Sequence, residues 1–156
     1  MVRRFERFSC AISEISRYWH KLAGEEMEKY GLKSSHSVYL TTLYRHGEGI
    51  PSARLCELTG RDKADVSRMM TIMEQKGLVL REGASYRAKL KLTPEGTKAA
   101  EHVCLRAAKA VELAGKDLAD EERRIFYDAL DSIAANLRIL CETGLPENEE
   151  GEKICL

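Results

Sequence analysis

Apolar residues recur along the first thirty positions at alternating steps of three and four. This spacing is the period of one face of an α-helix, and Gly31 ends the pattern. The sequence therefore predicts a long N-terminal helix whose apolar stripe is covered by the rest of the domain or by another chain. The stripe consists of Phe5, Phe8, Ile12, Ile15, Trp19 and Leu22.

Three further helical segments follow. The first covers residues 35–46, and the second begins at Pro51, a residue suited to the first turn of a helix. A turn at Thr59-Gly60 leads to the third, which starts after the N-cap residue Asp62 and stops at Gly77. A short helix, a glycine-containing turn and a second helix form the helix-turn-helix pattern. The face of the second helix that points inward is predicted to carry Val66, Met69 or Met70, and Met73.

After Gly77 the periodicity changes from that of a helix to that of strands. Residues 78–80 are apolar, and residues 89–92 alternate polar with apolar, as a half-buried strand does. The polar loop 81–87 between them indicates a β-hairpin. Thr93-Pro94-Glu95 then starts an alanine-rich helix to about residue 118, and residues 119–143 form a last helix with a coiled-coil-like seam. The seam consists of Phe126, Leu130, Ile133, Leu137 and Leu140.

Charge is distributed unevenly, although the chain as a whole is neutral. The hydrophobic content of 44% and the charged content of 32% are typical of a globular protein. Residues 61–92 contain eight basic and four acidic residues, a local charge of +4, whereas residues 117–156 contain eleven acidic and four basic ones. A basic segment on an otherwise acidic protein favours contact with phosphates.

The sequence predicts neither a membrane segment nor a metal or cofactor site. No apolar run approaches the roughly 18 residues of a spanning helix, and no apolar signal core follows the N-terminus, so a cytoplasmic protein is expected. The five cysteines are scattered without a CxxC pair, which argues against a zinc site and a disulfide framework. The four histidines form no catalytic grouping with cysteine or serine, so an enzyme is not expected.

The outward face of the helix 63–76 is the candidate surface for DNA recognition. Its N-terminal half carries small, polar and charged side chains, as a helix that enters the major groove does. Arg68 is suited to guanine or a phosphate, and Asp65 either accepts from a cytosine amino group or holds Arg68 in position. The alternative is an ordinary solvated helix face. The predicted DNA contacts here are Arg61, Lys63, Ala64, Asp65, Ser67, Arg68 and Thr71.

The hairpin loop supplies a second candidate contact. Arg87 is the residue best suited to enter the minor groove, with Tyr86 and Lys89 supporting it on sugar or phosphate. The alternative is a charged turn that prevents edge-to-edge aggregation.

From Leu55 to Gly96 the sequence resembles the MarR family of bacterial transcriptional regulators, and the order of the flanking helices extends the resemblance over nearly the whole chain. The most specific motifs are Gly77-Leu78-Val79 and Leu92-Thr93-x-x-Gly96. The resemblance implies a homodimer that binds a pseudo-palindromic operator, usually as a repressor released by a small molecule or an oxidant. Many members carry an Asp-x-Arg-Arg wing motif. Here the corresponding stretch is residues 83–87 and lacks the aspartate, so Arg87 would take the place of the wing arginine.

The expected architecture is therefore mainly α with a small β-hairpin wing: a winged helix-turn-helix with long N- and C-terminal dimerisation helices. The predicted divisions are an N-terminal dimerisation helix at 1–34, the DNA-binding domain at 35–96, C-terminal dimerisation helices at 97–144, and an acidic, disordered tail at 145–156. The expected partners are double-stranded DNA, a second copy of the chain and a small-molecule effector.

Two alternatives stay open. Cys10, with three arginines within two turns, suggests a redox-responsive regulator of the same fold, against a cysteine simply packed at a dimer base. The apolar terminal helices would also suit a helical interaction protein that does not bind DNA.

For an effector pocket, the candidate residues are Trp19, His36, Tyr39 and Tyr44, with ordinary core packing as the alternative.

Overall fold

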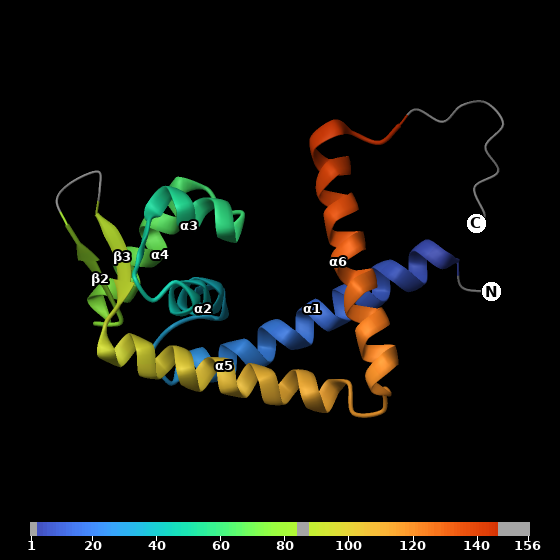
Figure 1. Ribbon diagram of the computed structural model, residues 1–156, viewed down its shortest axis with the longest axis horizontal. Helices are drawn as coiled ribbons and strands as arrows, with labels where there is room; N and C mark the ends of the chain where they lie inside the picture. The colour runs from blue at the N-terminus through green and yellow to red at the C-terminus, as the bar shows by residue number, and fades with distance from the viewer. Residues whose placement is uncertain (1–2, 84–87, 147–156) are drawn as a thin grey trace. The chain divides into compact units, whose positions relative to one another are not determined.

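The computed structural model describes residues 3–83 and 88–146 (Figure 1). Within these residues the chain forms six α-helices, one short 3-10 helix and a three-stranded antiparallel sheet. The elements are α1 (Arg4–Glu28), η1 (Ser34–His36), α2 (Ser37–Arg45), β1 (Ile50–Pro51), α3 (Ser52–Thr59), α4 (Lys63–Gln75), β2 (Val79–Glu82), β3 (Lys89–Leu92), α5 (Pro94–Ala114) and α6 (Asp120–Thr143). The mainly helical fold with a small hairpin is the one that the sequence predicts.

The described chain divides into two compact units. Residues 8–110 form the larger unit, and the remaining described residues form the smaller one. The larger unit contains a continuous apolar core, to which the end of α1, α2, α3, α4, the sheet and the start of α5 contribute. Its largest fully buried apolar side chains are Met27, Tyr39, Leu40, Leu43, Leu55, Met70, Met73 and Leu90.

The sheet has the order β1-β3-β2, so β3 lies between two antiparallel neighbours. The hairpin of β2 and β3 lies where the sequence predicts it, but β1 was not predicted. The sequence interpretation of Pro51 as the first helical residue was wrong, because Pro51 has φ −62° and ψ 151° and pairs with Lys89. The proline ring fixes only φ, and pairing with β3 selects the extended ψ. As an edge strand, β1 tolerates a residue without an N–H.

Two helix boundaries depend on local capping. At the start of α4 the Asp62 carboxylate accepts from the Asp65 N–H at 2.8 Å, as the sequence predicts. The last helix, α6, starts at Asp120, where the Ala119 N–H donates to Glu122 Oε2 at 2.8 Å. The helix α5 ends at Ala114, four residues before the predicted end, because Gly115 and the following turn interrupt it.

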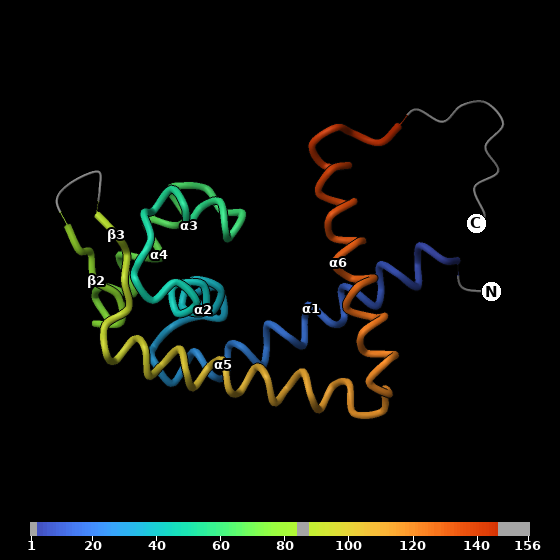
Figure 2. The backbone as a smooth tube through the Cα atoms, in the orientation of Figure 1, coloured from blue at the N-terminus to red at the C-terminus, as the bar shows by residue number. Residues whose placement is uncertain are grey.

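A compact junction joins the end of α4, the start of β2 and the start of α5. The Thr93 N–H donates to the Leu78 carbonyl at 3.0 Å, and the Thr93 hydroxyl donates to the Gly77 carbonyl at 2.7 Å. The same hydroxyl accepts from the Gly96 N–H at 2.9 Å, which caps α5. Figure 2 shows β3 running directly into α5 at this point. The two motifs that carry the family resemblance are therefore bonded to each other.

None of the described helices combines the length and the apolar character that crossing a membrane requires.

Candidate nucleic-acid interface

The helix α4 has a buried face and an exposed face, and the exposed face is the candidate interface. Val66, Met70 and Met73 are almost completely buried and hold the helix on the core, which confirms the inward face and selects Met70 over the half-buried Met69. The exposed side chains of its N-terminal half include small ones, which allow close approach of a ligand to the helix. The exposed predicted DNA contacts are Lys63, Ala64, Ser67, Arg68 and Thr71.

The N-terminus of α4 and the turn before it are exposed to solvent. Gly60 has φ 63°, a left-handed conformation that favours glycine, and the exposed Arg61 follows it. The Asp62 cap occupies one N–H of the first turn, and the N-terminal end of a helix carries a partial positive charge that favours anions. Together with Arg61 and Lys63, this end of α4 is suited to a phosphate.

Asp65 is held by two side chains, one from each side. Its Oδ2 accepts from the Tyr39 hydroxyl at 2.5 Å, and its Oδ1 accepts from Arg68 Nη2 at 2.6 Å. The hydrogen bond from Tyr39, followed by that from Arg68, lowers the pKa of Asp65, while burial raises the pKa of Tyr39. Of the two roles predicted for Asp65, the structure therefore contains the one in which it positions Arg68.

The sheet presents further basic groups. Lys89 is exposed at the start of β3, and Arg81 of β2 pairs with Glu74 of α4 at 2.7 Å, which ties the hairpin to the helix. Tyr86 and Arg87, the predicted minor-groove contacts, lie outside the described residues. Their role and that of Lys89 stay predictions.

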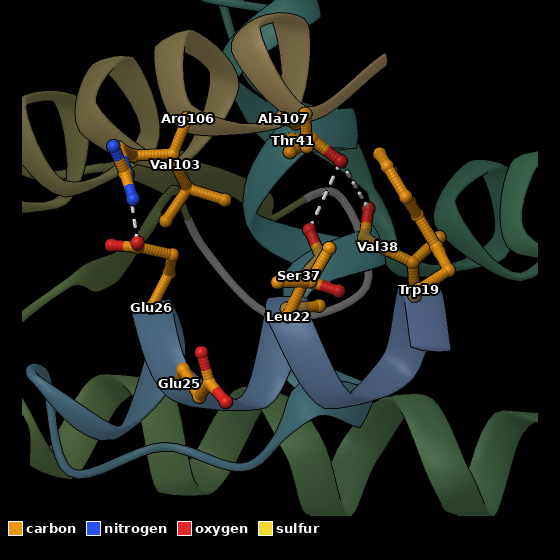
Figure 3. Close-up of a pocket in the computed structure, with 12 residues that line it drawn as sticks. Trp19, Leu22, Glu25, Glu26, Ser37, Val38, Thr41, Val103, Arg106 and Ala107 are labelled. Carbon is orange, nitrogen blue, oxygen red and sulfur yellow. Dashed lines mark hydrogen bonds and ion pairs between the residues drawn. The ribbon is translucent and has the colours of Figure 1, made fainter. Parts of the chain in front are cut away.

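A pocket of about 280 Å³ lies between α1, α2 and α5 within the larger unit (Figure 3). Most of its wall is apolar or small, and three charged side chains complete it. The lining residues are Trp19, Leu22, Ala23, Glu25, Glu26, Ser37, Val38, Thr41, Val103, Arg106, Ala107 and Ala110.

One wall of the pocket carries a carboxylate with three donors. Glu26 Oε2 lies 2.5 Å from Lys29 Nζ and 2.8 Å from His102 Nε2, and Oε1 accepts from Arg106 Nε at 2.8 Å. The hydrogen bonds from Lys29, Arg106 and His102 lower the pKa of Glu26 from 4.5 to about 2. Figure 3 shows the Glu26–Arg106 pair at one end of the pocket and Trp19 at the other. The pocket thus has an aromatic end and a charged end.

Of the four residues predicted to form an effector pocket, only Trp19 lines this one. His36 and Tyr39 belong to the core, with exposed fractions of 2% and 1%, and Tyr44 is partly exposed but is not part of the wall. On α2, Val38 and Thr41 are three residues apart and share the face toward the pocket, whereas Tyr39 is rotated by about 100° from Val38. The contribution of α5 was not predicted, and its signal in the sequence is the small side chains of Ala107 and Ala110.

His36 is a buried polar residue that is only partly hydrogen-bonded. Its Nδ1 lies 3.1 Å from the Lys33 nitrogen, and its Nε2 has no hydrogen-bond partner among the described residues. Burial lowers the pKa of His36 below 6.5, so the ring is held neutral. A neutral buried histidine in this place contributes to the core.

The described cysteines are free thiols, and Cys10 is exposed on α1. No group of three or more potential ligands in residues 3–83 and 88–146 is arranged to hold a metal ion. The redox role of Cys10 stays a prediction.

Two helices carry unusually exposed apolar stripes. The predicted stripe of α1 is solvent-exposed along its whole length, from 40% at Phe8 to 57% at Ile15. On α6, Phe126, Ile133 and Leu137 are also exposed, by 42%, 37% and 47%. Apolar faces of this extent mark interaction surfaces.

Comparison with known proteins finds similarity in structure. No protein-family model matches the chain, and no curated protein matches it in sequence. A MarR transcriptional regulator from Methanosarcina mazei Go1 is 27% identical, with a TM-score of 0.76 over 86% of this chain and 92% of the other.

Two other solved structures have the same fold at lower identity. A MarR-family regulator from Listeria monocytogenes, complexed with a 26mer DNA, is 19% identical, with a TM-score of 0.76 over 89% of this chain and 96% of that one. The protein CouR from Rhodococcus jostii RHA1, bound to p-coumaroyl-CoA, is 19% identical, with a TM-score of 0.69 over 81% of this chain and 91% of that one.

The first two of these proteins are described as MarR transcriptional regulators, and this chain shares the fold of all three, as the sequence predicts. Within this chain, α4 exposes one face next to the sheet, and the two motifs that carry the resemblance meet at the Thr93 junction. In its fold and in these motifs, the chain resembles the MarR winged helix-turn-helix transcriptional regulators.

Proposed function

We propose that the chain is a cytoplasmic, homodimeric repressor that binds a pseudo-palindromic operator sequence-specifically and is released by a small ligand. The observation that carries this proposal is the two-faced α4, which is fixed to the core by one side and exposes small, polar and basic side chains on the other. A helix of this kind at the end of a helix-turn-helix is suited to the major groove.

The direct contacts to bases come from Ser67, Arg68 and Thr71 of α4, and the small Ala64 allows the helix to sit deep in the groove. Arg61 and Lys63 contact phosphates, close to the positively charged end of the helix. Tyr86, Arg87 and Lys89 complete the interface from the wing. The Listeria relative in complex with DNA supports this assignment.

The homodimer is formed by the exposed apolar stripes of α1 and α6. Single exposed apolar residues are common on proteins, but a whole stripe at helical spacing on an exposed face requires a partner. A second copy of the chain provides one, and a two-fold symmetric dimer matches a pseudo-palindromic operator.

The effector binds in the pocket between α1, α2 and α5. A ligand with an apolar body packs on Trp19, Leu22 and Val38, and its polar groups lie toward Glu26 and Arg106. The relative with a bound p-coumaroyl-CoA supports a ligand-responsive regulator.

Selection from a pool of random DNA duplexes tests the central claim. We expect the wild type to enrich an inverted repeat, and its affinity for that sequence, measured by fluorescence anisotropy, to fall steeply with salt. Arg68→Ala should weaken binding about tenfold or more, because it removes a contact to a base edge.

Arg124→Ala is a matched control. Arg124 is 64% exposed and pairs with an acidic residue three positions earlier, as the 65% exposed Arg68 does. It lies on α6, outside the proposed DNA interface and outside the apolar stripe of that helix. Its affinity should equal that of the wild type. Failure of the wild type to enrich any sequence, together with no binding to duplex DNA at low salt, would defeat the proposal.

Light scattering during size-exclusion chromatography tests the dimer. The 17.6 kDa chain should elute at twice this mass, and Ile12→Glu in the α1 stripe should shift it toward the monomer. Leu58→Glu, at a side chain of similar exposure outside both stripes, should leave the mass unchanged. A monomeric wild type would contradict the dimer.

A further inference from the structure

Tyr39 belongs to the core, yet its hydroxyl bonds to the exposed side of the recognition helix. The side chain is 1% exposed, and burying its hydroxyl requires a hydrogen-bond partner. That partner is Asp65 Oδ2, 26 residues further along the chain and 2.5 Å away. The hydrogen bond therefore fixes one carboxylate oxygen of α4 from inside the protein.

The second oxygen of the same carboxylate carries Arg68. The Asp65 side chain is 21% exposed and Arg68 is 65% exposed, with 2.6 Å between Oδ1 and Nη2. An exposed pair of side chains three positions apart ordinarily contributes little, because both partners lose conformational freedom when they meet. Here Tyr39 already holds the carboxylate, so less conformational freedom is lost when the guanidinium binds it.

We propose that Tyr39 is a positioning residue for DNA recognition: through Asp65 it sets the direction of the Arg68 guanidinium and thereby the base preference of α4. The inference rests on the proposed function, since it requires that Arg68 contact bases. Tyr39 itself touches no DNA and is hidden from it by α4. Asp65 then acts as the link between them.

The test compares base preferences as well as affinities. Wild type, Tyr39→Phe and Arg68→Ala are each used in the selection from random duplexes, and their Kd values are measured on the sequence that the wild type selects. We expect Arg68→Ala to lose the preference at particular base pairs of each half-site. Tyr39→Phe should weaken the preference at those same base pairs only, and should raise Kd about threefold to tenfold, the effect of one hydrogen bond.

Tyr44→Phe is the matched control, because it removes the same atom from the same helix at a hydroxyl with no hydrogen bond among the described residues. It should select the wild-type sequence with a Kd within twofold. Denaturant unfolding of each variant reports its stability separately. A loss of stability alone would not change the preference at one set of base pairs and leave the others intact.

The double variant tests the route through Arg68. In the Arg68→Ala background, Tyr39→Phe should change Kd less than twofold, since nothing remains to be positioned. Asp65→Asn, which keeps the size of the side chain and an acceptor for Tyr39 but removes the negative charge, tests the link from Asp65 to Arg68 separately. It should weaken the same base preferences.

The inference is overturned if either Tyr39→Phe or Asp65→Asn keeps the wild-type base preference, or if Tyr39→Phe weakens binding equally with and without Arg68. With a wild type that selects a sequence and an Arg68→Ala that loses it, such a result removes only the role of Tyr39. A wild type that selects no sequence would remove the proposed function and this inference together.

Discussion

Replacing Gly96 by alanine should destabilise the protein, although it places a good helix former in the first turn of α5. A Cβ at this position would lie 1.9 Å from the Leu78 carbonyl oxygen and 2.9 Å from its carbon. Backbone atoms cannot rotate away as a side chain can. Either the backbone at Leu78 and the start of α5 must therefore move apart, or the close contact must remain and strain the structure.

Both routes have a cost of similar size. Separation breaks the two hydrogen bonds that Thr93 donates to the carbonyls of Gly77 and Leu78, each contributing about 1 kcal/mol. Strain from overpacking costs about 1–3 kcal/mol. The higher helix propensity of alanine offsets up to about 1 kcal/mol, so a net loss of about 1–2 kcal/mol is expected. For a chain of this size that lowers Tm by about 2–8 °C.

Thermal and denaturant unfolding at one fixed protomer concentration measure this loss. The control is Gly24→Ala within α1, where the nearest atom to an added Cβ is Ser34 Cβ at 3.8 Å, an ordinary contact. That variant should be more stable than the wild type by about 0.5–1 kcal/mol, since alanine loses less backbone entropy in a helix. If Gly96→Ala were as stable as Gly24→Ala, the close approach of α5 to Leu78 would be refuted.

Three further predictions concern capping and pH. Asp62→Ala should lower the free energy of unfolding by about 1 kcal/mol through loss of the α4 cap, measured by urea unfolding, while Asp62→Asn keeps an acceptor and should lose much less. Glu26 has its pKa lowered from 4.5 to about 2 by its three donors, so the unfolded chain takes up its proton first as pH falls. The contribution of Glu26 to the free energy of unfolding is complete above pH 4.5 and disappears toward pH 2. Glu26→Gln should therefore show a weaker dependence of stability on pH between these values. A pH dependence equal to that of the wild type would contradict the three-donor cluster. Burial lowers the pKa of His36 below 6.5, so stability should likewise fall as pH decreases through 6.5, and less so in His36→Asn; equal pH profiles of the two proteins would argue against a neutral buried ring.

Much of the fold follows from local patterns in the sequence. Asp62, Gly60 and Gly77 mark the ends and the turn of the helix-turn-helix, and Thr93 marks the start of α5, because capping and left-handed turns depend on a few neighbouring residues. The alternation from Lys89 to Leu92 identifies β3 for the same reason. These features predict the candidate surface on α4 as well, since the buried and exposed faces of a helix are fixed by its period.

What the local patterns leave open is decided by contacts between distant segments. Pro51 suits a strand or a helix by its own φ, and pairing with Lys89 decided for the strand. Tyr39 is an aromatic residue of the kind that often lines a ligand pocket. The direction in which α2 packs instead places Tyr39 against Asp65, and it places Val38 and Thr41 at the pocket. The sequence alone determined where the helices lie, to within a few residues at their ends, and which of their faces are apolar. Only the tertiary structure decided which helix face packs against which other element, because each of these contacts depends on a partner tens of residues away in the sequence.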